Sequence, residues 1–476
     1  MKTRKIFKYI VVLCVSALLY SCVTPRVIEK TENKTVPIGY TNATDTANIA
    51  RLNWRQYFQE PTLIALIDTA LKNNQELNIM MQEIEISKNE IRTRKGEYLP
   101  FVDFGASASV EKEGRFTRYG AVDDNLDIKP GTAFPEPFND YRVGLYASWE
   151  VDIWKKLRNA KKAALVRYLA STEGRNFAVT NLISEIANSY YELMALDNML
   201  SIIEQNIEIQ TNGLEVVKQQ KDAAKTTQLA VNRFEAQLLN TKNRQYEIRQ
   251  RIMETENRIH FLTGGFPKAI PRNAAAFNTI AVDYIASGIP SQLLANRPDI
   301  RQAELTLAAA RLDIKVARAN FYPSLRLEAG AGFQAFNPAY LIKPESMLYN
   351  LGGELIAPLI NRNAIIATYK SANAKQIQEA YNYEKTILNA YLEVVNQLSK
   401  VENYAKSFQT KASEVDLLLQ SITISNNLFR SARADYLEVL LTQREALESK
   451  MDLIEIKMKQ LNAKVDIYKA LGGGWN

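Results

Sequence analysis

The chain has few of the residues that build disulfides, metal centres and catalytic sites. Its 476 residues include two cysteines, Cys14 and Cys22, and one histidine, His260. Cys14 lies in an N-terminal segment that we expect to be removed, so the mature chain keeps one cysteine and no disulfide. A lone histidine makes no metal site, and we expect His260 to be structural. The sequence therefore predicts a protein held together by packing, without a metal or cofactor.

Catalytic motifs are also missing from the sequence. It contains no Gly-x-Ser-x-Gly motif and no phosphate-binding loop, and no cysteine is available as a thiol nucleophile. Acidic pairs such as Glu83 and Glu85 are typical of solvated helix surfaces rather than of a general acid and base. We therefore expect no catalytic residue and no enzyme.

Charge of one sign does not dominate. The net charge of +7 is modest for this length, and no run of lysine and arginine stands out. A solvated mixed-charge surface fits this pattern better than a nucleic-acid face. We therefore expect no nucleic-acid partner.

The N-terminus has the pattern of an export signal. Basic residues precede a short apolar core from Ile10 to Leu19, which predicts a signal peptide over residues 1–21. The sequence Leu19-Tyr20-Ser21-Cys22 resembles a bacterial lipobox, in which the cysteine is lipidated. We therefore predict lipidation of Cys22 and a lipidated tether over residues 22–50; alternatively, the signal is an ordinary one and the cysteine is incidental.

Long apolar runs are absent after this signal, so we expect no transmembrane helix. Apolar and polar residues instead alternate in four segments, at residues 102–110, 141–150, 325–334 and, less regularly, 348–359. Each is about as long as a membrane-crossing strand, which needs roughly 9–11 residues. The alternation predicts either strands that face lipid on one side and water on the other, or half-buried strands of a soluble sheet.

Long helices are the second strong signal. Apolar residues step by three and four from Ile300 to Phe321 and from Leu447 to Tyr468, which is the heptad pattern of coiled coils. Residues 153–264 contain no proline. They predict a helical hairpin with a bend near Gly213 and two arms of about 50 residues, each roughly 75 Å long.

The two halves of the chain resemble each other. The sequence Tyr98-Leu99-Pro100 returns as Phe321-Tyr322-Pro323, and residues 188–193 return as 389–394. We predict a first repeat at 51–264, an equatorial linker at 265–298, a second repeat at 299–472 and a C-terminal tail at 473–476. Each repeat would contain a helix, two strands and a long helical hairpin.

Four strands are too few to close a barrel around an aqueous channel. In lipid, an open sheet edge leaves backbone groups without hydrogen bonds. Either the strands lie outside a membrane, or several chains share one barrel. The predicted lipid anchor favours the shared barrel.

Several segments together resemble a known family. They are the stretch 290–323 around Arg297-Pro298-Asp299, the sequence from Trp149 to Trp154, and the C-terminus from Tyr468 to Asn476. They resemble the outer-membrane lipoprotein channels of resistance-nodulation-division (RND) efflux systems, the OprM and NodT type within the TolC group. The resemblance covers nearly the whole mature chain.

The resemblance implies an α+β membrane protein that forms a homotrimer. Each chain would give four strands to a twelve-stranded β-barrel, continued by a long α-helical coiled-coil barrel in the periplasm. An equatorial belt would come from residues 50–75, 265–298 and the C-terminus. The implied function is the exit channel of a tripartite pump for drugs and other small toxic molecules, with an inner-membrane RND pump and a periplasmic adaptor as partners.

Two other functions remain as alternatives to this one. A type I protein secretion channel would use the same tube. A periplasmic adaptor, by contrast, is expected to have one hairpin and a small all-β insert, whereas this sequence has two repeats and no such insert.

In this family, the periplasmic hairpin tips close the tube and an adaptor opens it. The resemblance places one tip near residues 213–228 and the other near 425–437, where Arg430, Arg433 and Asp435 are the gate candidates. We hypothesise that Asp435 pairs with one of these arginines, within or between chains; alternatively, the three charges form a solvated turn. Arg297-Pro298-Asp299 is interpreted as structural, because Pro298 suits a first helical turn and Asp299 suits a helix N-terminus.

Overall fold

The computed structural model describes residues 24–40, 47–280, 287–431 and 433–475, so the predicted signal peptide and Cys22 lie outside the described residues. The chain forms two units, each assembled from both halves of the sequence. The strand unit gathers residues 24–31, Glu85–Leu169 and Leu305–Tyr381, and the hairpin unit gathers Glu32–Ile84, Ala170–Glu304 and Asn382–Asn476.

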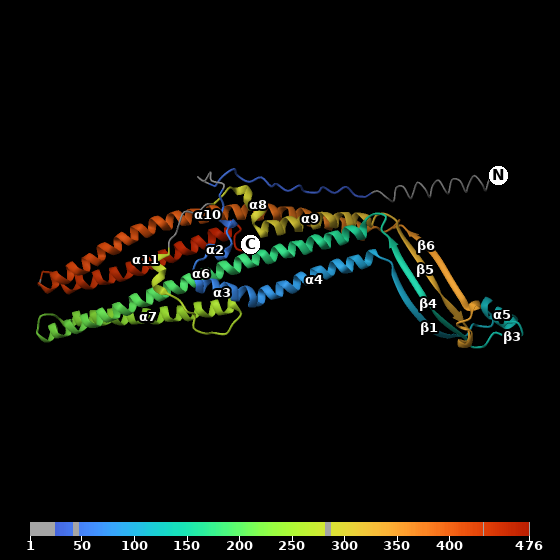
Figure 1. Ribbon diagram of the computed structural model, residues 1–476, viewed down its shortest axis with the longest axis horizontal. Helices are drawn as coiled ribbons and strands as arrows, with labels where there is room; N and C mark the ends of the chain where they lie inside the picture. Colours follow the sequence, from blue (N-terminus) through green and yellow to red (C-terminus); the bar gives the residue numbers. More distant parts are fainter. Residues whose placement is uncertain (1–23, 41–46, 281–286, 432, 476) are drawn as a thin grey trace. The chain divides into compact units, whose positions relative to one another are not determined.

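The strand unit contains a four-stranded antiparallel sheet in the order β1-β4-β5-β6 (Figure 1). Its strands are β1 (Phe101–Glu111), β4 (Phe138–Val151), β5 (Ser324–Ala335) and β6 (Met347–Ile356). All four predicted strands are confirmed. The last one ends at Ile356, earlier than the alternation suggested, because Pro358 has no N–H for a sheet hydrogen bond.

Short elements fill the two strand connections. Between β1 and β4 lie α5 (Arg118–Asn125), β2 (Asp127–Lys129) and β3 (Thr132–Ala133), and between β5 and β6 lie η4 (Pro338–Tyr340) and η5 (Pro344–Ser346). The two connections touch, since the Lys129 Nζ atom donates a hydrogen bond to the Tyr340 hydroxyl at 2.6 Å.

Long helices begin or end next to these strands. They are α4 (Gln75–Tyr98), α6 (Lys156–Asp222), α9 (Pro298–Ala319) and α10 (Asn363–Arg430), and each contributes residues to both units. The carboxylate of Asp152 links β4 to α6, because it accepts hydrogen bonds from the backbone N–H groups of Leu157 and Arg158 at 3.1 and 3.0 Å. It thereby satisfies amides that a helix start leaves unpaired.

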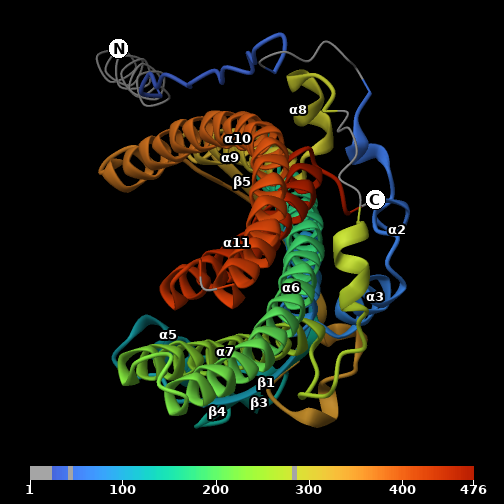
Figure 2. The same ribbon diagram turned by 90° about the vertical axis from the view of Figure 1, so that its left-hand side faces the viewer.

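The hairpin unit is built on an apolar core between helices. Besides parts of the long helices it contains η1 (Ile49–Arg51), α2 (Trp54–Tyr57), α3 (Pro61–Asn73), α7 (Gln228–Thr263), η2 (Ala274–Thr279), η3 (Pro290–Gln292), α8 (Leu293–Asn296) and α11 (Tyr436–Ala470). Ile67 of α3, Tyr190 of α6 and Leu461 of α11 lie buried in one cluster. In the hairpin unit, α7 lies beside α6 and α11 beside α10 (Figure 2).

The predicted bend near Gly213 is wrong. Helix α6 runs through Gly213 to Asp222, and the turn lies at residues 223–227. A glycine inside a helix costs only about 1 kcal/mol, and the neighbouring apolar residues Leu214 and Val217 are buried in a cluster with α7. The hairpin arms are therefore unequal, with 67 residues in α6 and 36 in α7.

Residues 24–40, the described part of the chain that follows Cys22, are held at defined points. In the strand unit, the amide of Gln376 makes two hydrogen bonds with the backbone of Lys30, accepting at 3.0 Å and donating at 2.7 Å. In the hairpin unit, the backbone N–H of Asn33 donates to Glu384 at 2.9 Å. These contacts fix the path of the predicted tether beside α10.

Candidate functional site

The sheet of the strand unit has one apolar face. The register places Phe104 opposite Leu145, Leu145 opposite Ala331, and Ala331 opposite Tyr349. Because side chains alternate along a strand, this register brings the apolar positions of all four strands to the same side. Phe104 is 71% exposed and Tyr349 is 80% exposed. An apolar face of this extent marks a surface for lipid or for another protein.

The opposite face of the sheet is polar. There Glu150 lies opposite Arg326, and Arg326 lies opposite Glu354. Asp140 accepts a hydrogen bond from Gln334 at 2.9 Å and pairs with Arg142 at 2.7 Å. One side of the sheet is therefore suited to hydrocarbon and the other to water.

Both edges of this sheet are open. Within the ranges that the structure describes, β1 pairs only with β4, and β6 pairs only with β5. Each edge strand thus offers a row of backbone N–H and C=O groups to another strand.

The second hairpin tip carries the three gate candidates. Helix α10 ends at Arg430, Arg433 lies in the turn, and Asp435 directly precedes α11. The Asp435 side chain does not cap α11, although its carbonyl accepts a hydrogen bond from the Glu438 N–H at 3.1 Å. In the described part of this single chain, no ion pair joins Asp435 to either arginine. Pairing between chains stays a prediction.

The motif around Arg297 forms a buried polar centre in the hairpin unit. The Arg297 guanidinium binds Asp299 at 2.8 and 3.0 Å, Glu393 at 2.7 Å and the carbonyl oxygen of Ala470 at 2.8 Å. Burial by itself would lower the pKa of Arg297, but the two carboxylates outweigh it and raise the pKa above its usual value. The side chain therefore ties α9, α10 and the end of α11 together as a permanent cation.

The sequence identified Arg297 but missed its partner Glu393. The two residues are 96 positions apart, and heptad patterns carry no information on such pairings. A signal was nevertheless present in the repeat, since Glu393 matches Glu192 of the first half. Glu192 also pairs with arginines, Arg251 at 3.4 Å and Arg258 at 3.3 Å.

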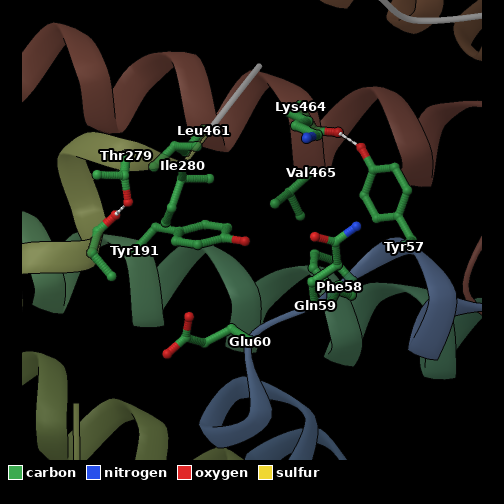
Figure 3. A pocket seen from close by; sticks show the side chains of 11 residues that line it. Tyr57, Phe58, Gln59, Glu60, Tyr191, Thr279, Ile280, Leu461, Lys464 and Val465 are labelled. Carbon is green, nitrogen blue, oxygen red and sulfur yellow. Dashed lines mark hydrogen bonds between the residues drawn. The ribbon is translucent and has the colours of Figure 1, made fainter. Parts of the chain in front are cut away.

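A cavity of about 360 Å³ lies in the hairpin unit between the segment before α3, the η2 region, α6 and α11 (Figure 3). Tyr57 borders it, donates a hydrogen bond to the carbonyl oxygen of Lys464 at 2.6 Å, and stacks on Tyr468 at 4.1 Å. Glu60 and Tyr191 also line the cavity. These contacts join the linking segments to the helices.

His260, metal-binding groups and membrane-spanning helices were the other subjects of the sequence predictions. The Nε2 atom of His260 lies 2.7 Å from the carbonyl oxygen of Lys268, at the end of α7. Among the described residues, no group of three His, Cys, Asp or Glu side chains could hold a metal ion. Over those same ranges, no helix is both long and apolar enough to cross a membrane.

Comparison with known proteins gives consistent matches. The family model described as "Outer membrane efflux protein" matches residues 66–265 and 289–473. The solvent efflux pump outer membrane protein SrpC of Pseudomonas putida is 29% identical over 423 residues, which cover 89% of this chain and 87% of SrpC. The pyoverdine export outer membrane protein OpmQ of Pseudomonas putida is 30% identical over 473 residues, 98% of each chain. The open state of the Neisseria gonorrhoeae MtrE outer membrane channel has a similar fold, with a TM-score of 0.81, 22% identity, and coverage of 95% of this chain and 98% of MtrE.

Proposed function

Because this chain belongs to the outer membrane efflux protein family, we propose that it is the exit channel of a tripartite RND-type efflux pump. It lies in the outer membrane and acts as a passive conduit for drugs and other small toxic molecules. The two-faced sheet carries this proposal. Its strands of 10 to 14 residues are long enough for the hydrocarbon layer, which needs about 9–11.

The channel is proposed to be a homotrimer. Four strands cannot surround water, and open edges are not stable in lipid. Three chains with four strands each give twelve strands. Pairing the β1 edge of one copy with the β6 edge of the next removes every open edge, turns the apolar face to lipid and encloses the polar face.

The helical hairpins are proposed to continue this tube into the periplasm. The sequence repeats at 51–264 and 299–472 then supply equivalent parts, with 265–298 as the linker and 473–476 as the tail. The Arg297 centre supports this organisation, because it joins the end of the linker to α10 and α11 of the second repeat. An adaptor protein opens the tube at the hairpin tips, where Arg430, Arg433 and Asp435 hold the closed state through pairs between neighbouring copies.

The membrane anchor is proposed to be a lipid on Cys22 after removal of residues 1–21. The contacts of Lys30 and Asn33 support this, since they guide the N-terminal segment along the body of the protein. The lipid and the strands would then hold the same chain in the same membrane.

A type I protein secretion channel is the alternative within the same fold. The relatives SrpC and OpmQ are named for efflux of solvents and export of pyoverdine. They favour small molecules as the cargo.

Ethidium accumulation in cells with and without this protein tests the proposal. Deletion should raise accumulation, and collapse of the proton gradient should abolish the difference, because the pump and not the channel supplies the energy. Restoring the wild-type gene should restore efflux. Unchanged accumulation, together with loss of a secreted protein, would instead identify the secretion channel.

A further inference from the structure

The two junctions where a strand leads into a long helix share an arrangement of residues. Trp154-Lys155-Lys156 joins β4 to α6, and Ile360-Asn361-Arg362 joins β6 to α10. In each, an exposed apolar residue comes first, with Trp154 45% and Ile360 90% exposed. A residue with positive φ follows, 60° at Lys155 and 54° at Asn361, and then a basic residue.

Lysine is an unusual choice for this backbone conformation. Asparagine adopts the left-handed region readily, whereas lysine does so at a cost. Asn361 shows that the turn can be made without lysine. The positive charge of Lys155 therefore calls for an explanation other than the turn itself.

Positive charge is concentrated after both junctions. Residues 155–172 and 361–378 contain no acidic residue. The basic residues of these two segments are Lys155, Lys156, Arg158, Lys161, Lys162, Arg167, Arg362, Lys370 and Lys375.

Only some of these cations have carboxylate partners. Lys156 pairs with Glu150, Arg158 with Asp152, Arg167 with Asp313 and Lys375 with Glu379. Over the described ranges, Lys155, Lys161, Lys162 and Lys370 form no ion pair. Lys155 directly precedes the first turn of α6, where a cation opposes the helix dipole, so its charge does not stabilise that helix.

The apolar face of the sheet ends at these junctions. Val151 of β4 lies opposite Leu325 of β5, and Leu325 lies opposite Leu355 of β6, in the last rows before the helices. Beyond them, the Trp154 ring stacks on Tyr322 at 4.7 Å, and its Nε1 atom donates to the carbonyl oxygen of Pro323 at 2.7 Å. Such amphipathic rings mark the level of lipid head groups.

We propose that this junction surface, made of Trp154, Lys155, Lys161, Lys162, Ile360 and Lys370, binds anionic phospholipid head groups of the periplasmic leaflet. The lysines contact the phosphates, and the exposed apolar side chains enter the acyl region. A hollow of about 190 Å³ beside this surface is lined by Trp154, Tyr322 and Ile356 and also by the carboxylates Glu150 and Asp152, so the phosphates are placed at the exposed lysines and not in the hollow. The inference rests on the membrane-spanning role proposed for the strands.

Lipid retention by the full chain, purified in mild detergent, tests this inference. Native mass spectrometry would count molecules of phosphatidylglycerol or phosphatidylcholine retained at equal concentration. We expect the wild type to retain phosphatidylglycerol selectively, and Lys155→Asn combined with Lys161→Gln and Lys162→Gln to bind it at least about tenfold more weakly. Lys155→Asn alone, which suits the turn, should reduce retention in the same direction.

The matched control removes the same charge elsewhere, with Lys218→Gln, Lys225→Gln and Lys242→Gln, and should retain the lipid as the wild type does. Equal retention of both lipids, unchanged retention by the triple variant, or full competition by inorganic phosphate would overturn the inference. Ethidium efflux separates the two proposals. Failure of lipid selectivity with intact efflux contradicts this inference only.

Discussion

The Nη1 atom of Arg297 lies 2.7 Å from Oε2 of Glu393, a residue 96 positions away on α10. The arginine side chain is 6% exposed, and Arg297→Ala would leave the partly exposed carboxylates of Asp299 (16%) and Glu393 (31%) without their cation. Removing one partner of a fully buried pair costs about 3–5 kcal/mol, and the partial exposure of the remaining carboxylates makes this an upper bound. We expect a clearly lower thermal unfolding midpoint in detergent, measured by circular dichroism.

Arg94→Ala is the control for Arg297→Ala. Arg94 pairs with Glu97 at 3.0 Å, but its side chain is 40% exposed. An exposed pair contributes at most about 1 kcal/mol, so this variant should unfold close to the wild type. Equal losses in the two variants would contradict the role assigned to Arg297.

The two faces of the sheet predict different tolerance to charge. Leu145 lies on the apolar face, and Leu145→Arg should cost about 2–4 kcal/mol in lipid. Ser148→Arg places the same charge on the polar face and should be tolerated. The amount of folded protein in outer-membrane fractions measures both, and equal tolerance would argue against lipid contact.

The gate hypothesis predicts a specific electrical effect. If Asp435 pairs with Arg430 or Arg433 of a neighbouring copy, Asp435→Ala weakens the closed state and raises its current in planar bilayers. Asp222→Ala, at the other hairpin tip, is the control. Its closed-state current should stay below that of Asp435→Ala. An unchanged closed-state current in Asp435→Ala would identify these charges as a solvated turn.

Gly213 offers a stabilising substitution. An added Cβ would lie 3.6 Å from Phe234, at ordinary contact distance, and alanine favours a helix interior by up to about 1 kcal/mol. Gly213→Ala should therefore raise the unfolding midpoint. Gly264→Ala should lower it, since φ is +69° there and the Cβ would lie 2.5 Å from the Asn73 carbonyl oxygen. A destabilised Gly213→Ala variant would show that α6 must flex at this point.

The tyrosines around the cavity predict a loss of stability in alkali. Burial raises the pKa values of Tyr57, Tyr191 and Tyr468 above the usual value of about 10. The unfolded chain therefore loses these protons first. Their contribution is fully present below pH 10 and is lost as the pH rises further. Tyr191, beside the cavity in Figure 3, allows a direct test.

Tyr191→Phe removes one of these titrating groups. The fall of the unfolding midpoint above pH 10 should be shallower in this variant than in the wild type. Tyr246→Phe, on the exposed surface of α7, is the control and should follow the wild-type curve. Identical curves for all three proteins would contradict the assignment to buried tyrosines.

The sequence predicted the strands and the long helices well. Apolar residues recur every two positions in a strand and every three or four positions in a helix, and both patterns are visible in the sequence. Leu145 and Ala331 were both assigned to strands, but alternation could not show that they face each other. The bend predicted at Gly213 was wrong. Glycine disfavours a helix only weakly, and the buried contacts of Leu214 and Val217 keep α6 helical there. Arg297 was recognised as structural, yet its bond to Glu393 depends on the folded arrangement of distant helices.

The mass of the purified protein in mild detergent tests the central claim most directly, because a closed barrel requires three chains. Native mass spectrometry should show one non-dissociating species with the mass of three mature copies. A stable monomer, with both sheet edges open and no conductance in planar bilayers, would contradict the shared barrel and the channel built on it.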